Sequence, residues 1–114
     1  YNSLSKLTGK ILLAVRTDFR EPMSLTAVAR DMEMSSKYLG RVFLRETGMR
    51  FSQYLTAYRM TEARRLIVNT GEKVSVIASM VGYPQLNNFY THFRQYFWVS
   101  PSIMRAAPGK EETP

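Results

Sequence analysis

Two segments of the sequence place hydrogen-bonding side chains one helical turn apart, opposite a stripe of large apolar residues. The polar side carries Lys37 and Arg41 in the first segment, and Asn87 and Thr91 in the second. A guanidinium can bind guanine N7 and O6 together, an Asn amide can pair with adenine at two atoms, and Thr offers a hydroxyl and a methyl group. These residue types on an exposed helix therefore predict contact with base edges in the major groove of double-stranded DNA.

Each of these side chains also has a simpler interpretation. Arg41 suits a phosphate or an acidic side chain, and Lys37 suits a phosphate as well as a base. Asn87 and Asn88 stand at an expected helix start, where they would serve equally well as caps. Gln85 is predicted to be an N-cap or a phosphate contact. Contacts to the DNA backbone are predicted for Ser35, Ser36, Arg45, Gln85 and Arg94.

The elements that must position these side chains are all helical, because apolar residues recur at three- and four-residue steps and no alternating strand pattern occurs. Helices are expected at about residues 4–19, 25–32, 35–47, 51–69, 74–81 and 85–97, with a short last helix from about residue 101. Serines are the expected starts of four of them, at Ser3, Ser24, Ser35 and Ser100. Residues 108–114 are expected to form a flexible tail.

The same pattern of a short helix, a tight turn and a second helix occurs twice. The offset is 49 residues between Ala29 and Ala78 and 50 residues between Phe43 and Phe93, so the second turn holds one extra residue. Gly82 suits a left-handed backbone in the second turn, whereas Glu33 holds that place in the first, so we expect the first turn to differ in shape.

The repeat predicts two helix-turn-helix modules, at residues 1–50 and 71–107, joined by a linker helix at residues 51–70. About 18 helical residues span roughly 27 Å, whereas successive major grooves on one face of B-DNA lie about 34 Å apart. Both modules can therefore bind together only if the DNA bends or one module binds imperfectly. We expect a site of about 20 base pairs that is bent when fully occupied.

The charge and composition exclude several other classes of site. Sixteen Lys and Arg against nine Asp and Glu give a net charge of +7, which favours a polyanionic partner, although an ordinary solvated surface is the alternative. The absence of cysteine excludes disulfides, thiolate metal sites and cysteine nucleophiles, and it fits a reducing compartment. His92 is the single histidine and lacks a second ligand, so we expect no metal, no cofactor and no enzymatic activity.

Two further expectations concern the aromatic and methionine residues and the ends of the chain. The seven Met, seven Tyr and six Phe residues favour core packing over a ligand pocket, because they fall at helical spacing. No apolar run approaches the roughly 20 residues that cross a bilayer. The chain does not begin with Met, which predicts a preceding part that holds a regulatory input.

Two stretches of the chain together resemble the DNA-binding domain of the AraC/XylS family of transcription regulators. They read SLTAVARDMEMSSKYLGRVFLRETGMRFSQYLTAYRMTEARRLI and VSVIASMVGYPQLNNFYTHFRQYFWVSPSIMR, and they extend from Ser24 to Arg105. The resemblance implies an all-α fold of about seven helices in two lobes and a bacterial, cytoplasmic regulator at promoter DNA. It also implies contact with RNA polymerase, usually activation of transcription, and a preceding sensor or receiver domain.

The resemblance also assigns residues. The family's base-reading positions fall on Lys37, Gly40, Arg41, Leu86, Asn87, Asn88 and Thr91. Three positions depart from the family's pattern. Gly40 stands where a side chain is usual, Trp98 replaces a small residue before Val-Ser-Pro, and Met104 replaces an aromatic residue before Arg105. Because Gly40 has no side chain, we expect the first module to contact fewer bases. Trp98 and Met104 are expected to alter the packing beside the last helix and to leave the fold intact.

Other functional classes remain as alternatives. An enzyme would need a nucleophile–base pair or a metal cluster, and the sequence suggests neither. An RNA-binding or protein-interaction module would favour exposed aromatic side chains, whereas these aromatics are at core spacing. An architectural protein would bind every duplex alike and lose affinity steeply with salt. Competition between duplex and single-stranded nucleic acid distinguishes the RNA-binding alternative.

Overall fold

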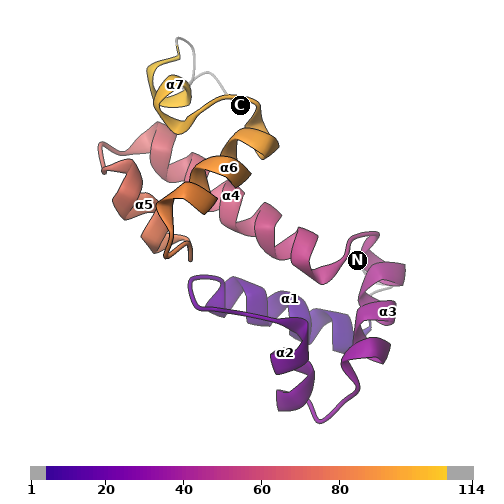
Figure 1. Cartoon of the computed structure of the whole chain (residues 1–114). Helices are drawn as coiled ribbons and strands as arrows, with labels where there is room; N and C mark the ends of the chain where they lie inside the picture. The colour runs from indigo at the N-terminus through magenta and orange to yellow at the C-terminus, as the bar shows by residue number, and fades with distance from the viewer. Residues whose placement is uncertain (1–4, 108–114) are drawn as a thin grey trace. The chain divides into compact units, whose positions relative to one another are not determined.

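The computed structural model describes residues 5–107, which form seven helices and no strand (Figure 1). The helices are α1 (Lys6–Asp18), α2 (Leu25–Asp31), α3 (Ser36–Thr47), α4 (Phe51–Asn69), α5 (Val74–Met80), α6 (Leu86–Phe97) and α7 (Pro101–Ala106). The predicted all-α fold of seven helices is confirmed. The predicted tail lies outside the described residues. No helix within residues 5–107 has both the length and the hydropathy that a membrane span requires.

Serine hydroxyls cap four helices, because each accepts a hydrogen bond from a backbone N–H in the first turn. Ser24 accepts from Ala27, Ser35 from Tyr38 and Ser100 from Ile103, over 3.1–3.2 Å. The cap of α1 is Ser5, which accepts from Thr8 over 3.3 Å. The prediction of Ser3 as this cap was wrong, since the helix begins at Lys6; Ser3 and Leu4 themselves lie outside the described residues.

The chain divides into two compact units between Tyr58 and Arg59, within α4. The first unit contains α1, α2, α3 and the first part of α4. Its centre is formed by buried apolar side chains, namely Ile11, Val15, Leu39, Val42, Phe43, Phe51 and Leu55. Ser5 joins α1 to α3, because its N–H and its hydroxyl both donate to Glu46 Oε1 over 3.0 Å. These contacts hold α3 from its buried side.

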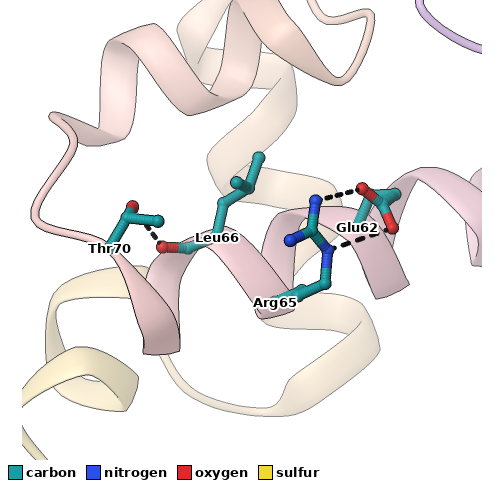
Figure 2. A network of polar contacts seen from close by, with 4 residues as sticks. All are labelled: Glu62, Arg65, Leu66 and Thr70. Atoms are coloured by element: carbon teal, nitrogen blue, oxygen red, sulfur yellow. Dashed lines mark hydrogen bonds and ion pairs between the residues drawn. The ribbon is translucent and has the colours of Figure 1, made fainter.

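The second unit contains the rest of α4 with α5, α6 and α7. Its buried side chains are Met60, Ala63, Leu66, Ile67, Ile77, Ala78, Val81, Tyr83, Phe89 and Phe93. Arg105 Nε donates to the Ile67 carbonyl over 3.0 Å, which places a cation beside the last turn of α4. Figure 2 shows this end of the helix, where Thr70 Oγ1 donates to the Leu66 carbonyl over 2.6 Å and Arg65 pairs with Glu62. Helix α7 in turn packs on α6.

The hydrogen-bonded first part of the turn has the same shape in the two modules, so the expected difference in shape at Glu33 was wrong. The N–H of Met34 donates to the Ala29 carbonyl, and that of Tyr83 donates to the Ala78 carbonyl, both over 2.9 Å. The residue four positions after each alanine has a positive φ, 57° at Glu33 and 97° at Gly82. The hydrogen bonds on both sides of Glu33 fix the left-handed conformation without the help of a glycine.

The turns differ in length as expected. Residues 32–35 join α2 to α3, whereas residues 81–85 join α5 to α6. The extra residue follows Tyr83, after the shared hydrogen-bonded part of the turn. The two modules therefore present their second helices on equivalent turns.

Candidate nucleic-acid interface

Helix α3 buries one side and exposes the other. Leu39, Val42 and Phe43 are at most 3% exposed and face α1 and α2. Lys37 and Arg41 are exposed on the opposite side, as predicted, and Arg45 is exposed beside them. Within the described residues neither Lys37 nor Arg41 has a carboxylate within ion-pair distance. Both cations are therefore available to an external ligand.

Gly40, one of the base-reading positions that the resemblance implies, is half-buried and lies against α2. A Cβ at this position would lie 3.0 Å from Leu25 Cδ2 of α2. Gly40 thus allows α2 and α3 to approach, which gives a packing reason for the missing side chain. Tyr38, which sequence reasoning overlooked, is 44% exposed on α3. The 50-residue offset could have identified it, because it maps Tyr38 onto Asn88.

Helix α6 has the same arrangement in the second unit. Phe89 and Phe93 are fully buried, and α6 packs on α5 and α7. Asn87, Asn88 and Thr91 are exposed on the other side, whereas Leu86 is half-buried at the first helical position. The structure therefore brings the exposed residues of the predicted base-reading set onto one face of α6.

The start of α6 decides between two interpretations of its asparagines. Gln85 holds the N-cap position, and its side chain makes no capping hydrogen bond. Asn88 Nδ2 donates to Gln85 Oε1 over 3.1 Å, so Asn88 bonds to a side chain and caps no backbone N–H. The side-chain amide of Asn87 has no hydrogen-bond partner among residues 5–107. Its amide is therefore free for a ligand.

The predicted backbone contacts surround these two faces. Ser35 is the N-cap of α3, and its hydroxyl accepts from Tyr38 N while its proton can still be donated. Ser36 is half-buried at the first position of α3, and Arg45, Gln85 and Arg94 are exposed. All five residues belong to α3, α6 or their N-caps.

Helices α3 and α6 end alike. Gly48 and Trp98 follow them with φ of 78° and 68°, and each backbone N–H donates to a carbonyl four residues earlier over 2.8 Å. Trp98 is the most exposed of the large apolar side chains, at 88%. Within residues 5–107 no group of three His, Asp or Glu side chains lies close enough to hold a metal ion.

Comparison with known proteins places this geometry in a family. A family model described as a helix-turn-helix domain matches residues 28–107. The transcriptional activator RhaS of Escherichia coli (strain SE11) is 34% identical over 105 residues, covering 91% of this chain and 37% of RhaS. The chain spans between 13% and 38% of the length of the curated relatives it matches.

Solved structures give the same result. The C-terminal domain of AraT, a response regulator from Geobacillus stearothermophilus, superposes with a TM-score of 0.88 and 31% identity, over 90% of this chain and 86% of that one. The DNA-binding domain of the global transcription factor AdpA, solved with a target DNA, has a TM-score of 0.82 and 26% identity, over 92% and 94%. The chain therefore belongs to the AraC/XylS family of transcription regulators and is a DNA-binding domain of the helix-turn-helix type.

Proposed function

We propose that α3 and α6 each enter a major groove of promoter DNA and select its sequence. The observation that carries the proposal is the repeated design of the two helices, with a fully buried apolar side and a solvent-facing polar side. The base-contacting residues are Lys37 and Arg41 on α3, and Leu86, Asn87, Asn88 and Thr91 on α6. Ser35, Ser36, Arg45, Gln85 and Arg94 bind phosphates and fix the orientation of each helix.

The complex of the related AdpA domain with a target DNA supports a duplex as the ligand. The net charge of +7 agrees with a polyanion, and it supplies the part of the affinity that does not depend on sequence. The free amide of Asn87 and the unpaired guanidinium of Arg41 are the groups suited to bidentate base pairing.

The proposal extends to the regulator of which this domain is the output part. Relatives include a named activator, RhaS, and a response-regulator domain, AraT. We infer that the domain works in the bacterial cytoplasm, on the nucleoid, where it receives its signal from a sensor or receiver domain. At the promoter it acts on RNA polymerase, usually as an activator.

Selection of binding sites from a random duplex library tests the proposal. The wild-type domain should enrich a motif in two parts about one helical turn apart. Arg41→Ala should relax one part and Asn87→Ala the other. The matched controls are Arg16→Ala and Asn69→Ala, which remove an exposed guanidinium from α1 and an exposed amide from the end of α4. Both controls should select the wild-type motif.

The contrary result is binding without an enriched motif, together with steep loss of affinity in salt, which would identify an architectural protein. A single-stranded competitor that displaces the duplex at equal concentration would instead identify a binder of single strands.

A further inference from the structure

The residue that ends α6 has an unfavourable backbone conformation and an exposed side chain. Trp98 has a φ of 68°, a region that disfavours every L side chain and suits glycine. The equivalent residue after α3 is Gly48, with a φ of 78° and the same 2.8 Å hydrogen bond. The Trp98 side chain is 88% exposed, so almost no burial offsets this strain. The fold alone gives no reason for a tryptophan here.

The position of Trp98 follows the proposed base-reading face of α6. Asn87, Thr91 and Arg94 are separated by four and three residues, which aligns them in one stripe along α6, and Trp98 follows at the C-cap, four residues after Arg94. A groove of about 970 Å³ lies along the same stripe and is lined by Thr91, Arg94, Trp98 and Ile103, among others. The stripe therefore runs from the predicted base contacts directly to the indole.

The chemistry of this groove suits a strand of DNA. Arg94 supplies a positive charge, and the lining residues include no carboxylate. Trp98 and Ile103, which is 60% exposed, supply apolar surface on which deoxyribose carbons can pack. The indole N–H is a hydrogen-bond donor, and it can reach a phosphate oxygen beside the sugar.

We propose that Trp98 is an additional DNA contact, which packs its indole against the sugar–phosphate strand bordering the major groove that α6 occupies. Arg94 binds a phosphate of the same strand, and Ile103 extends the apolar surface. The inference rests on the proposed function, because it takes the α6 stripe as the DNA-facing side. It explains why a strained position carries a large aromatic side chain.

The first test uses the fact that Trp98 is the only tryptophan in the chain, so fluorescence excited at the red edge of the absorption band, where the seven tyrosines do not absorb, reports on this side chain alone. In the free protein acrylamide should quench the exposed indole efficiently. Saturation with a duplex enriched by the wild-type domain should lower the quenching constant severalfold and shift the emission. An unchanged quenching constant on the saturated complex overturns the proposal and points to a protein partner for this surface.

The second test separates DNA contact from folding. Trp98→Gly should raise the melting temperature, because glycine accepts a φ of 68° without strain. The same substitution should weaken binding to the selected duplex about tenfold, as truncation of an interface hot spot does. Trp98→Phe should retain most of the affinity. A variant that is more stable and yet binds less tightly has lost a contact, since unfolding cannot explain both changes.

Leu13→Ala is the control, because Leu13 is 59% exposed on α1 and belongs to no proposed contact. It should bind the selected duplex as the wild type does. If Trp98→Gly also binds with wild-type affinity, the inference about Trp98 fails while the proposed function stands. If the wild-type domain itself enriches no duplex, the proposed function fails and this inference fails with it.

Discussion

Arg94 lies on α6 between the proposed base contacts and Trp98, and its guanidinium is exposed. The phosphate that it is proposed to bind is the same in every DNA sequence. Its loss should therefore affect all duplexes alike. We expect Arg94→Ala to weaken binding by a similar factor on selected and random duplexes, and to lower the slope of log affinity against log salt by about 1. Titrations of both duplexes at several salt concentrations measure this.

The comparison with Arg41→Ala makes the result decisive. Loss of a bidentate base contact should weaken the selected duplex by about 1–3 kcal/mol and leave the random duplex nearly unchanged. If Arg94→Ala instead discriminates between the two duplexes, Arg94 contacts a base and its assignment to the backbone is wrong.

Glu46 is a titratable residue that supports helix α3 from behind. The pKa of its carboxyl is below the ordinary value of 4.5, chiefly because the Thr8 hydroxyl and the Ser5 backbone N–H donate to it. A lowered folded-state pKa adds stability above the unfolded-state pKa, and this stability is lost as the pH falls through the folded-state pKa. The link between α1 and α3 should therefore weaken in acid.

Glu46→Gln keeps the shape of the side chain and removes its charge. We expect the variant to unfold more easily than the wild type at pH 7, and we expect the difference to fade below the folded-state pKa. Urea unfolding of the wild type and the variant, at pH 7 and at acidic pH, measures the difference in the free energy of unfolding under each condition. A difference that stays constant with pH would show that the charge of Glu46 has no part in this stabilisation.

At the scale of the elements, opposite substitutions in the two turns test whether the turns are equivalent. Glu33 and Gly82 hold equivalent left-handed positions, with φ of 57° and 97°. Glu33→Gly should stabilise the fold by about 0.5–1 kcal/mol, since the relief of strain exceeds the added entropy of the unfolded chain. Gly82→Ala should destabilise it by at least about 1 kcal/mol. Thermal unfolding of the two variants gives both signs, and equal signs would contradict the equivalence of the turns.

The helices were predictable because their apolar residues repeat at helical spacing, and the repeat was predictable from the offset between Ala29 and Ala78. The left-handed Glu33 was not, because residue preferences for φ are weak and the hydrogen bonds of Met34 and its neighbours override them. Two serines stand near the expected start of the first helix, Ser3 before Leu4 and Ser5 before Lys6 and Leu7. The contact of Ser5 with Glu46, which accompanies the cap at Ser5, is tertiary and cannot be predicted from local spacing.

In the candidate interface, too, the features set by local sequence could be predicted, whereas those set by tertiary packing could not. The exposed faces holding Arg41 and Asn87 follow from the helical positions of the buried aromatics, so they could be predicted. The position of Gly40 could not, because its approach to Leu25 depends on how α2 packs on α3. Likewise, the exposure of Trp98 depends on the left-handed end of α6 rather than on its residue type.

At the scale of the whole molecule, the proposal that both modules bind successive major grooves leads to a prediction about the bound DNA. Helix α4 has 19 residues, or roughly 28 Å at about 1.5 Å each, against the spacing of about 34 Å between grooves. We expect a selected duplex of about 30 base pairs to bend on binding, at a free-energy cost of a few kcal/mol. Energy transfer between dyes at the two ends should increase at saturation.

A domain that carries Asn87→Ala and Thr91→Ala should bend the same duplex less, because only its first module still binds firmly. Arg16→Ala should bend it as the wild type does. If the duplex is saturated with the wild-type domain and energy transfer stays at the value of the free duplex, the DNA is not bent. Either both modules then bind straight DNA, or one module does not bind the DNA.

The two-sided construction of α3 and α6 has a consequence for how such a regulator diverges. The outward residues Arg41, Asn87 and Thr91 are exposed, whereas Phe43, Phe89 and Phe93 carry the packing. Substitutions on the outward faces therefore leave the free energy of unfolding almost unchanged. If these residues contact bases as proposed, natural drift or a laboratory library randomised at those positions changes one half of the bound sequence at a time while the scaffold stays intact.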